Sequence, residues 1–418
     1  MIDFDIEAFV RRRMTGRPES LLAADYVQRS DEMHRRIDGK RFLVIGGAGT
    51  IGSNYVKAVL RDFKPAAMYV VDIDENALTE LTRELRSGDG FNVPDEYITE
   101  PIDLGTDLFK RFYQVKGPFD IVANFAARKH VRAERDVFSI EAMCETNVFM
   151  AKKLLDLLLE SPPEAFFCVS TDKAANPVNV MGATKKLMEE TIMAYSDKIP
   201  IKTARFANVA FSNGSLPMGW LNRIVKRQPL SCPLGIRRFF VSPIESGELC
   251  LFASVMAESG DIVYPKLDPK KDMIPFDTVV KDMLNDLELG CKPCSSTAEA
   301  KAAMEPLKTQ KISCGSCISW LDHGGYPCEF FRSDTSGEKT FEEFYTGTDV
   351  RDEVSFINVG RVRNTKKRPV AEVEAIFANL RGVFARANAT KADVIEVLKD
   401  YLPDFRHIEK GKSLDSRM

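Results

Sequence analysis

The chain has 418 residues, of which 44% are apolar and 28% charged, and its formal net charge is -3. This length predicts one large domain or two interleaved domains with a sizeable core. The balanced charge gives no electrostatic reason to expect nucleic acid as a partner, and no apolar run is long enough to span a bilayer. Nine cysteines and the absence of a secretory signal at the N-terminus predict reduced thiols and a cytoplasmic location.

Short apolar strands alternate with longer helical stretches through the first half of the chain. Residues 1–38 come before this alternation and are predicted to be a charged helical arm. The alternation itself predicts a doubly wound α/β fold, in which helices cover both faces of a parallel sheet. The predicted strands are 41–46, 67–72, 97–103, 120–126, 165–171 and 202–209, and the predicted helices include 51–62, 75–85, 141–160 and 182–195.

The pattern becomes less regular after residue 210, where proline and glycine interrupt it repeatedly. We therefore expect a first domain at 39–210 and a smaller C-terminal substrate-binding domain at 211–365, with a cysteine-containing insert at 286–325. Helical periodicity returns in 366–418, which is predicted to be a C-terminal helical segment. Its apolar face comprises Val370, Val373, Ile376, Phe377 and Leu380.

A glycine-rich turn joins the first predicted strand to the first helix. Gly46 permits a tight turn, Gly49 lets the backbone approach a pyrophosphate, and Gly52 allows close packing of helix and strand. Thr50 and Ile51 open the helix, whose N-terminus attracts phosphate. The turn predicts an NAD(P)-binding Rossmann domain at 39–210. The alternative is a glycine-rich turn in an α/β protein that has no cofactor.

Two acidic residues follow the second predicted strand. Asp72 is placed to accept hydrogen bonds from the adenosine ribose, and Asp74 would disfavour a phosphate on that ribose. NAD is therefore favoured over NADP, although a nearby arginine would reverse this preference.

Polar residues gather where the fifth predicted strand ends. Ser170-Thr171-Asp172-Lys173 places hydroxyl, carboxyl and amine groups at the edge of the sheet where such folds bind ligands. Met181 and Lys185 lie four residues apart at a helix start, so both can face the same site. A solvated ion pair is the alternative interpretation of Asp172 and Lys173.

These residues resemble the extended short-chain dehydrogenase/reductases, in which the helix carries a tyrosine four residues before the lysine. Here Met181 stands at the tyrosine position, and a thioether cannot act as an acid or base. The run 170–185 is similar to the UDP-N-acetylglucosamine 4,6-dehydratases of the capsule and flagellin-glycan branch, some of which carry this methionine. Further similar segments are 124–131, 205–209, 238–240 and 337–343.

The resemblance implies oxidation at carbon 4 of the hexose, loss of the carbon-6 hydroxyl, and reduction at carbon 6. It implies Lys173 as the base at carbon 5 and Asp172 as the acid at the carbon-6 oxygen. Thr171 would bind the sugar near carbon 4, and Lys185 would hold the nicotinamide ribose. Lys185 acting through water, Asp172 and Thr171 are all possible acceptors of the carbon-4 hydroxyl proton.

The remaining predicted contacts lie on both sides of this site. A tightly bound NAD or NADP would also meet Asp103, Leu104, Ala126, Asn147 and Ser170. The predicted substrate-side residues are Lys129, Asn208, Arg238 and Glu338. By analogy with the family we expect a homo-oligomer. The alternatives are a nucleotide-sugar 4-epimerase or reductase of the same fold, and a non-catalytic protein that senses the cofactor.

Two cysteine pairs lie outside these motifs. Cys291 and Cys294 precede Cys314 and Cys317 at a spacing that fits a four-thiolate zinc site. Neither the resemblance nor the chemistry requires a metal there, so ordinary reduced cysteines are favoured over zinc.

Overall fold

A nine-stranded sheet forms the centre of the computed structural model, which describes residues 4–131, 134–308, 324–332, 337, 339, 341–363, 365 and 367–409. The strand order is β14 (Val350–Asp352), β15 (Val359–Arg363), β10 (Ile262–Pro265), β6 (Ile201–Ala204), β5 (Ala165–Val169), β4 (Ile121–Asn124), β1 (Arg41–Ile45), β2 (Ala67–Val71) and β3 (Glu96–Glu100). From β10 to β3 all neighbours are parallel, whereas β15 and β14 form an antiparallel edge. The predicted doubly wound α/β fold is confirmed.

One predicted strand is wrong in its extent. The run 202–209 is divided into β6 and a separate β7 (Asn208–Val209), which pairs with β9 (Arg237–Val241) in another sheet. Between them, Phe206 and Ala207 leave the sheet and line a cavity. The chain therefore crosses here from the large sheet to the smaller lobe.

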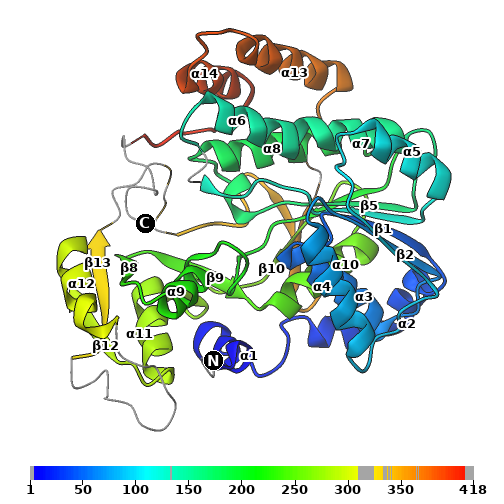
Figure 1. The fold of residues 1–418 in the computed structure, drawn as a ribbon. Helices are drawn as coiled ribbons and strands as arrows, with labels where there is room; N and C mark the ends of the chain where they lie inside the picture. Colours follow the sequence, from blue (N-terminus) through cyan, green and yellow to red (C-terminus); the bar gives the residue numbers. More distant parts are fainter. Residues whose placement is uncertain are drawn as a thin grey trace.

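Helices cover both faces of the large sheet, as Figure 1 shows. One face carries α2 (Ala23–Ile37), α3 (Thr50–Asp62), α4 (Glu75–Ser87) and α10 (Pro243–Met256), and the other carries α5 (Asp107–Lys116), α6 (Val137–Cys144), α7 (Met150–Leu158) and α8 (Val180–Met193). The predicted helix 141–160 contains a π-helical turn at Glu145–Phe149 between α6 and α7. Such turns often occur at functional sites.

Helices α3 and α10 approach each other closely at Gly247. A Cβ atom on this residue would overlap the backbone of Asn54 and lie 2.8 Å from the Tyr55 nitrogen. We expect Gly247→Ala to lower the free energy of unfolding by about 1–3 kcal/mol, because the helix backbones would have to separate. Urea unfolding followed by circular dichroism measures this loss.

Gly382→Ala is the matched control, because no other described part of the protein lies within 4 Å of the corresponding Cβ position in α13 (Val370–Phe384), apart from the helix's own backbone. Alanine there should stabilise the helix by up to about 1 kcal/mol. Equal effects of the two substitutions would contradict the packing argument.

A smaller lobe lies beside the carboxyl ends of the parallel strands. It contains two three-stranded sheets, β11 (Met273–Pro275)–β9–β7 and β12 (Cys291–Cys294)–β13 (Tyr326–Arg332)–β8 (Leu230–Leu234). Its helices are α9 (Leu216–Val225), α11 (Phe276–Asp286) and α12 (Thr297–Met304). The buried Trp220 lies in its core, which also includes Phe9, Val10 and Met14 from the N-terminal segment.

The N-terminal segment contacts both lobes. Its helix α1 (Ile6–Phe9) and the π-helical Val10–Thr15 pack into the smaller lobe, whereas Met33 and Ile37 of α2 join the core of the large sheet. Between these parts, Arg17 forms a 2.8 Å ion pair with Glu245 at the start of α10. Apolar burial and this ion pair therefore attach residues 6–37 along most of their length.

The C-terminal helices lie on the same side of the large sheet as α6 and α8 (Figure 1). Helix α13 and helix α14 (Lys391–Tyr401) share an apolar cluster with α6 and α8, and Val373, Ile376, Phe377 and Leu380 are buried in it. Val370 is only partly buried. The following segment donates from the Arg406 and Ile408 nitrogens to the Pro177 and Val178 carbonyls, and the Ile408 carbonyl accepts from Gly337.

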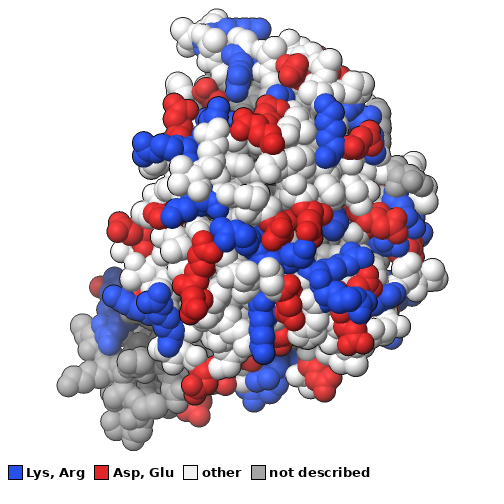
Figure 2. Space-filling model, turned by 90° about the vertical axis from the view of Figure 1, so that its right-hand side faces the viewer, with Lys and Arg blue, Asp and Glu red and all other residues white. Residues whose placement is uncertain are grey.

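Basic and acidic side chains are interspersed over the face that Figure 2 presents, without a large area of one sign. Ion pairs occur among the surface side chains of the protein, for example between Arg36 and Glu32 at 2.6 Å. Among the residues that the structure describes, no helix is both long and apolar enough to cross a membrane.

Candidate active site

The glycine turn between β1 and α3 leaves its backbone open to a cavity. Gly46 has a φ of +70°, and a Cβ there would lie 2.5 Å from the Ala126 nitrogen. A Cβ on Gly52 would overlap the Gly46 carbonyl oxygen, so only glycine permits this contact. At Gly49, the N-cap of α3, the nearest atom to a Cβ would be 3.5 Å away. The N-terminal amides of α3 therefore have room for an anionic ligand.

Most of the predicted site residues line one cavity of about 350 Å³ beside this turn. The turn contributes Gly46, Gly49, Thr50, Ile51 and Gly52, and the run 170–185 contributes Ser170, Thr171, Asp172, Lys173, Met181 and Lys185. Lys129 and Asn208 also line it. The structure thus brings the glycine turn and the end of β5 to the same space, which fits a dinucleotide that runs from one to the other.

Other predicted cofactor residues lie outside the lining of this cavity. Asp72 accepts from the Ala48 nitrogen at 2.9 Å and from the Asp74 nitrogen at 3.1 Å, which fixes its carboxylate against the glycine turn. Asp103 is exposed and accepts from the Gly105 nitrogen at 2.7 Å. Leu104, which is buried, and Ala126, which is partly buried, also lie outside the lining.

Asn147 lies in the π-helical turn, and its side chain forms hydrogen bonds with residues outside that turn. Its Oδ1 accepts from the Arg128 nitrogen at 2.8 Å, and its Nδ2 donates to the Arg128 carbonyl at 3.0 Å and to Thr184 Oγ1 at 3.1 Å. The side chain therefore ties the loop after β4 to helix α8. These hydrogen bonds stabilise the part of the cavity wall that this loop and α8 form.

Met181 and Lys185 face the cavity from helix α8 and are both buried. The Lys185 Nζ donates to the Val169 carbonyl at 3.0 Å. Burial lowers the pKa of Lys185 below its ordinary value, since the ammonium loses hydration. The amine is therefore easier to deprotonate than a surface lysine, and it lies next to a side chain that cannot carry a proton.

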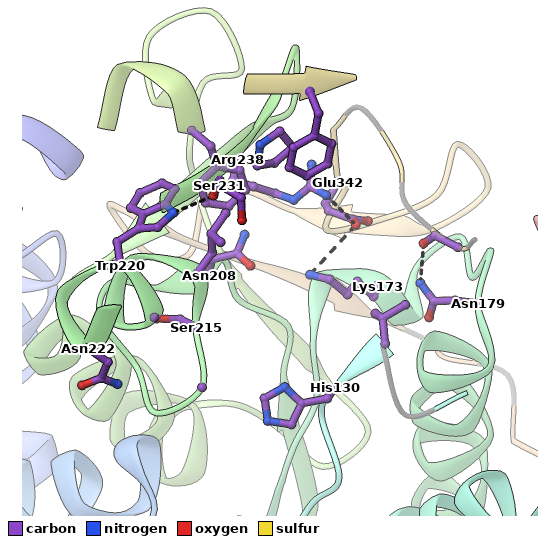
Figure 3. Close-up of a pocket in the computed structure, with 18 of the residues that line it drawn as sticks. His130, Lys173, Asn179, Asn208, Ser215, Trp220, Asn222, Ser231, Arg238 and Glu342 are labelled. Atoms are coloured by element: carbon purple, nitrogen blue, oxygen red, sulfur yellow. Dashed lines mark hydrogen bonds and ion pairs between the residues drawn. The ribbon is translucent and has the colours of Figure 1, made fainter. Parts of the chain in front are cut away.

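The end of β5 presents a lysine between two carboxyl groups. Lys173 Nζ lies 3.0 Å from Asp172 Oδ1 and 4.0 Å from Glu342 Oε1. Asp172 and Glu342 are buried, and the Lys173 side chain retains 17% exposure. Figure 3 shows Lys173 and Glu342 directed toward each other across the cavity wall. This is a compact set of proton donors and acceptors.

A buried ion pair stabilises the end of β5. Arg205 donates to Glu189 at 2.8 and 2.6 Å, and Ser170 Oγ donates to the same carboxylate at 2.6 Å. Burial acts to raise the pKa of Glu189, but the paired Arg205 outweighs it and holds the pKa below its ordinary value. Arg205 also donates to the Phe344 carbonyl at 3.0 Å. The pair therefore links β5, β6 and α8 to the segment that carries Glu342.

A larger cavity of about 580 Å³ continues from Lys173 and Asn208 into the smaller lobe. Trp220 donates to the Ser231 carbonyl at 2.9 Å at its far end, and Arg238 lies on its wall (Figure 3). Arg238 NH2 lies 3.9 Å from Glu342 Oε1. Gly337 lines the cavity, whereas the predicted Glu338 lies outside the described residues.

The structure tests only half of the predicted cysteine set, because Cys314 and Cys317 lie outside the described residues. Cys291 and Cys294 lie on β12, and the buried Cys328 lies on the neighbouring β13. A hydrogen bond with the Cys328 thiol lowers the pKa of Cys291. This contact between strands was not predicted from the sequence.

Sequence reasoning missed Glu342, His130 and Trp220 as cavity residues. Glu342 falls within the similar segment 337–343, but nothing in that segment distinguishes it from Glu338 or Glu343. The structure distinguishes Glu342 from Glu343 by burial, since Glu342 is buried and Glu343 is exposed. Trp220 is a large apolar residue in an irregular region, which predicts burial without indicating a cavity.

Comparisons with known proteins agree with this geometry. Residues 42–291 match the model of a family described as "Polysaccharide biosynthesis protein". The uncharacterized membrane protein MJ1061 of Methanocaldococcus jannaschii is 37% identical over 58% of this chain and 72% of its own length. The UDP-N-acetylglucosamine 4,6-dehydratase (inverting) of Campylobacter jejuni is 26% identical over 56% of this chain and 69% of its own length.

A solved structure shares the fold over most of both chains. Pen from Bacillus thuringiensis matches with a TM-score of 0.59 and 20% identity, over 80% of this chain and 90% of that one. The family match covers the glycine turn, the end of β5 and the first half of the smaller lobe. The chain therefore belongs to the polysaccharide biosynthesis protein family.

Proposed function

We propose that this protein is a nicotinamide-dependent nucleotide-sugar 4,6-dehydratase that acts on a UDP-linked N-acetylhexosamine, with UDP-N-acetylglucosamine as the favoured substrate. One observation carries the proposal: Lys173, flanked by Asp172 and Glu342, lines both the cavity beside the glycine turn and the larger cavity. A hexose at this junction would lie between the cofactor and the proton-transfer groups. The Campylobacter relative supports the choice of reaction and substrate.

The residues of the turn fit a dinucleotide whose phosphates bind the N-terminus of α3. When bound, a nicotinamide supplies the oxidation of carbon 4 and the later reduction of carbon 6. Lys185, which is buried in the cavity wall together with Met181, would hold the nicotinamide ribose. NAD is favoured, because the carboxylates of Asp72 and Asp74 would repel a phosphate on the adenosine ribose.

We expect NAD to bind more tightly than NADP, and Asp72→Asn to weaken NAD binding about tenfold or more. The substitution removes a charged acceptor of hydrogen bonds from the ribose, and such a bond contributes about 1.5–3 kcal/mol. Calorimetric titration of both dinucleotides measures the change. The exposed Glu75 at the start of α4 provides the control, and Glu75→Gln should change neither affinity. Tighter NADP binding by the unaltered protein would contradict this assignment.

The chain's own residues would perform the elimination. A ketone at carbon 4 acidifies the hydrogen on carbon 5, and the Lys173 amine removes that hydrogen as a proton. An acid must then protonate the departing carbon-6 oxygen, and two carboxyl groups flank Lys173. Lys185, Thr171 and Asp172 line the cavity with Met181 and are the candidates for accepting the carbon-4 hydroxyl proton.

Two alternatives are less well supported. An epimerase or reductase needs proton transfer at carbon 4 alone, so it gives no reason for an amine between two carboxyl groups. A non-catalytic sensing protein is compatible with Met181, but it needs no buried carboxyl group on the substrate side.

Incubation with UDP-N-acetylglucosamine and NAD, followed by mass spectrometry and NMR, tests the proposal. A UDP-linked 4-keto-6-deoxy sugar is the expected product. Formation of the galacto epimer would identify an epimerase, and binding without turnover would identify a sensing protein. Either result would overturn the dehydratase assignment.

A further inference from the structure

Glu342 is a buried carboxyl group that the sequence did not single out. Its side chain is 4% exposed and lines the larger cavity. The groups that face it are Lys173 at 4.0 Å, Arg238 at 3.9 Å and Lys339 at 4.0 Å, together with the Asp172 carboxyl group. Its Oε2 makes no hydrogen bond with any described residue. The carboxyl group therefore lies within reach of charges, but no described residue holds it in a hydrogen-bonded ion pair.

Asp172 lies in a different environment on the other side of Lys173. Its Oδ1 accepts three hydrogen bonds, from Thr171 Oγ1 at 2.7 Å, from the Lys173 backbone nitrogen at 2.9 Å and from Lys173 Nζ at 3.0 Å. An ionised carboxylate is suited to accept this many bonds. Its Oδ2 also lacks a partner among the described residues, so burial alone does not separate the two groups. The two carboxyl groups differ instead in the number of hydrogen-bond donors that they meet.

Electrostatics agrees with this difference. Burial raises the pKa of Glu342 above its ordinary value. The positive charges of Lys173, Arg238 and Lys339 oppose this shift, whereas the Asp172 carboxylate adds to it. The pKa remains raised, so Glu342 is suited to carry a proton at the start of the reaction.

We propose that Glu342 is the general acid of the elimination and protonates the carbon-6 oxygen, while Asp172 accepts a hydrogen bond from Lys173 and holds it in place. This inference rests on the proposed dehydratase function and changes the role that the resemblance implied for Asp172. The Lys173 amine takes the proton from carbon 5, and the electron pair of that bond first enters an enolate with the carbon-4 ketone. The same pair then forms the carbon 5–carbon 6 double bond. The carbon 6–oxygen bond breaks as Glu342 donates its proton, and water leaves.

The proton balance of this step closes within the site. Elimination leaves Lys173 as an ammonium and Glu342 as a carboxylate, 4.0 Å apart, which is a favourable pair. Lys173 then returns its proton to carbon 5 when carbon 6 is reduced. The proton lost from the carbon-4 hydroxyl during oxidation restores Glu342. The only net change is the loss of water from the sugar.

Turnover in heavy water with the full-length protein and NAD tests the assignment. In Glu342→Gln we expect Lys173 to remain active, so deuterium should enter carbon 5 of the sugar while 4-keto-6-deoxy product falls about 10²–10⁴-fold. In Asp172→Asn, exchange and product should fall together, because Lys173 loses its anchor. The exposed neighbour Glu343 provides a matched control, and Glu343→Gln should keep both rates.

Infrared spectroscopy of the protein without substrate provides a second readout. A protonated carboxylic acid gives a carbonyl band that an ionised carboxylate lacks. Near neutral pH, Glu342→Gln should remove part of this band. Glu248 serves as a reference, because burial raises its pKa to about 7 and Glu248→Gln should remove a component that titrates there. A band unchanged by Glu342→Gln would overturn the inference.

The outcomes separate this inference from the function on which it rests. If the unaltered protein makes no 4-keto-6-deoxy sugar, the dehydratase proposal fails and the inference fails with it. If it makes the product and Glu342→Gln makes it equally fast, only the role of Glu342 fails. Exchange without product in Asp172→Asn, but not in Glu342→Gln, would assign the acid to Asp172. Retained NAD binding shows that each variant is folded, and Glu342→Asp should recover part of the rate.

Discussion

Lys173→Ala is expected to reduce the rate of water loss from the nucleotide sugar by about 10²–10⁴-fold, because the base at carbon 5 is removed. Deuterium exchange at carbon 5 should stop as well, which distinguishes this variant from Glu342→Gln. Affinity for NAD should stay unchanged, since the glycine turn and Lys185 remain intact. Product formation in heavy water and calorimetric titration of NAD measure the two effects.

Added primary amines provide a sharper test of the same role. A small amine that enters the cavity of Lys173→Ala should restore part of the exchange, and more so at higher pH, where more of the amine is neutral. Lys226, exposed at the end of α9, is the control, and Lys226→Ala should behave like the unaltered protein. Loss of NAD binding in Lys173→Ala would show that the residue has a structural role.

Arg205→Met is expected to lower the free energy of unfolding by about 3–5 kcal/mol, because it leaves the Glu189 carboxylate buried without its partner. Both side chains are at most 2% exposed, so water cannot replace the lost bonds. Urea unfolding followed by circular dichroism measures the change. The substitution also removes the bond to the Phe344 carbonyl, so catalysis should weaken in the fraction that remains folded.

The exposed pair of Arg83 and Glu80 provides the control for this prediction, with both side chains about two-thirds exposed. Arg83→Met should change stability by no more than about 1 kcal/mol, as is typical of surface ion pairs. Replacing Arg205 and Glu189 together by apolar residues should destabilise less than the single change, because no buried charge is left. An Arg205→Met protein as stable as the control would contradict the burial argument.

The sequence allowed strands β1 to β6 of the large sheet to be predicted because most of them are short apolar runs between turns. Strands β10, β14 and β15 were not predicted as part of this sheet, because they lie in the irregular stretch after residue 210. Strand β1 differs from its prediction only by the omission of Gly46, which begins the turn. The break in 202–209 could not be predicted, because Phe206 and Ala207 are as apolar as the strand before them. Only pairing with β9, a contact distant in sequence, draws Asn208 away from the large sheet.

The candidate site shows the same limit. Residues 170–173 and 181–185 lie in one local strand–turn–helix unit, so spacing alone predicted that they would meet. Glu342 reaches Lys173 from a segment more than a hundred residues away in the chain, and no local pattern marks that approach. Asn147 was predicted to contact the cofactor, but in the structure the π-helical turn directs its amide to Arg128 and Thr184.

The backbone of residues 406–408 bonds to Pro177 and Val178 on one side and to Gly337 on the other. Pro177 and Val178 follow Lys173 in the chain, and Gly337 precedes Glu342. Residues 406–408 thus bridge these two stretches, and under the proposed function they would help to set the separation of the Lys173 amine and the Glu342 carboxyl group. Removal of residue 406 and all residues after it would therefore be expected to impair the proton transfers that involve Lys173 and Glu342. The glycine turn between β1 and α3 would stay intact.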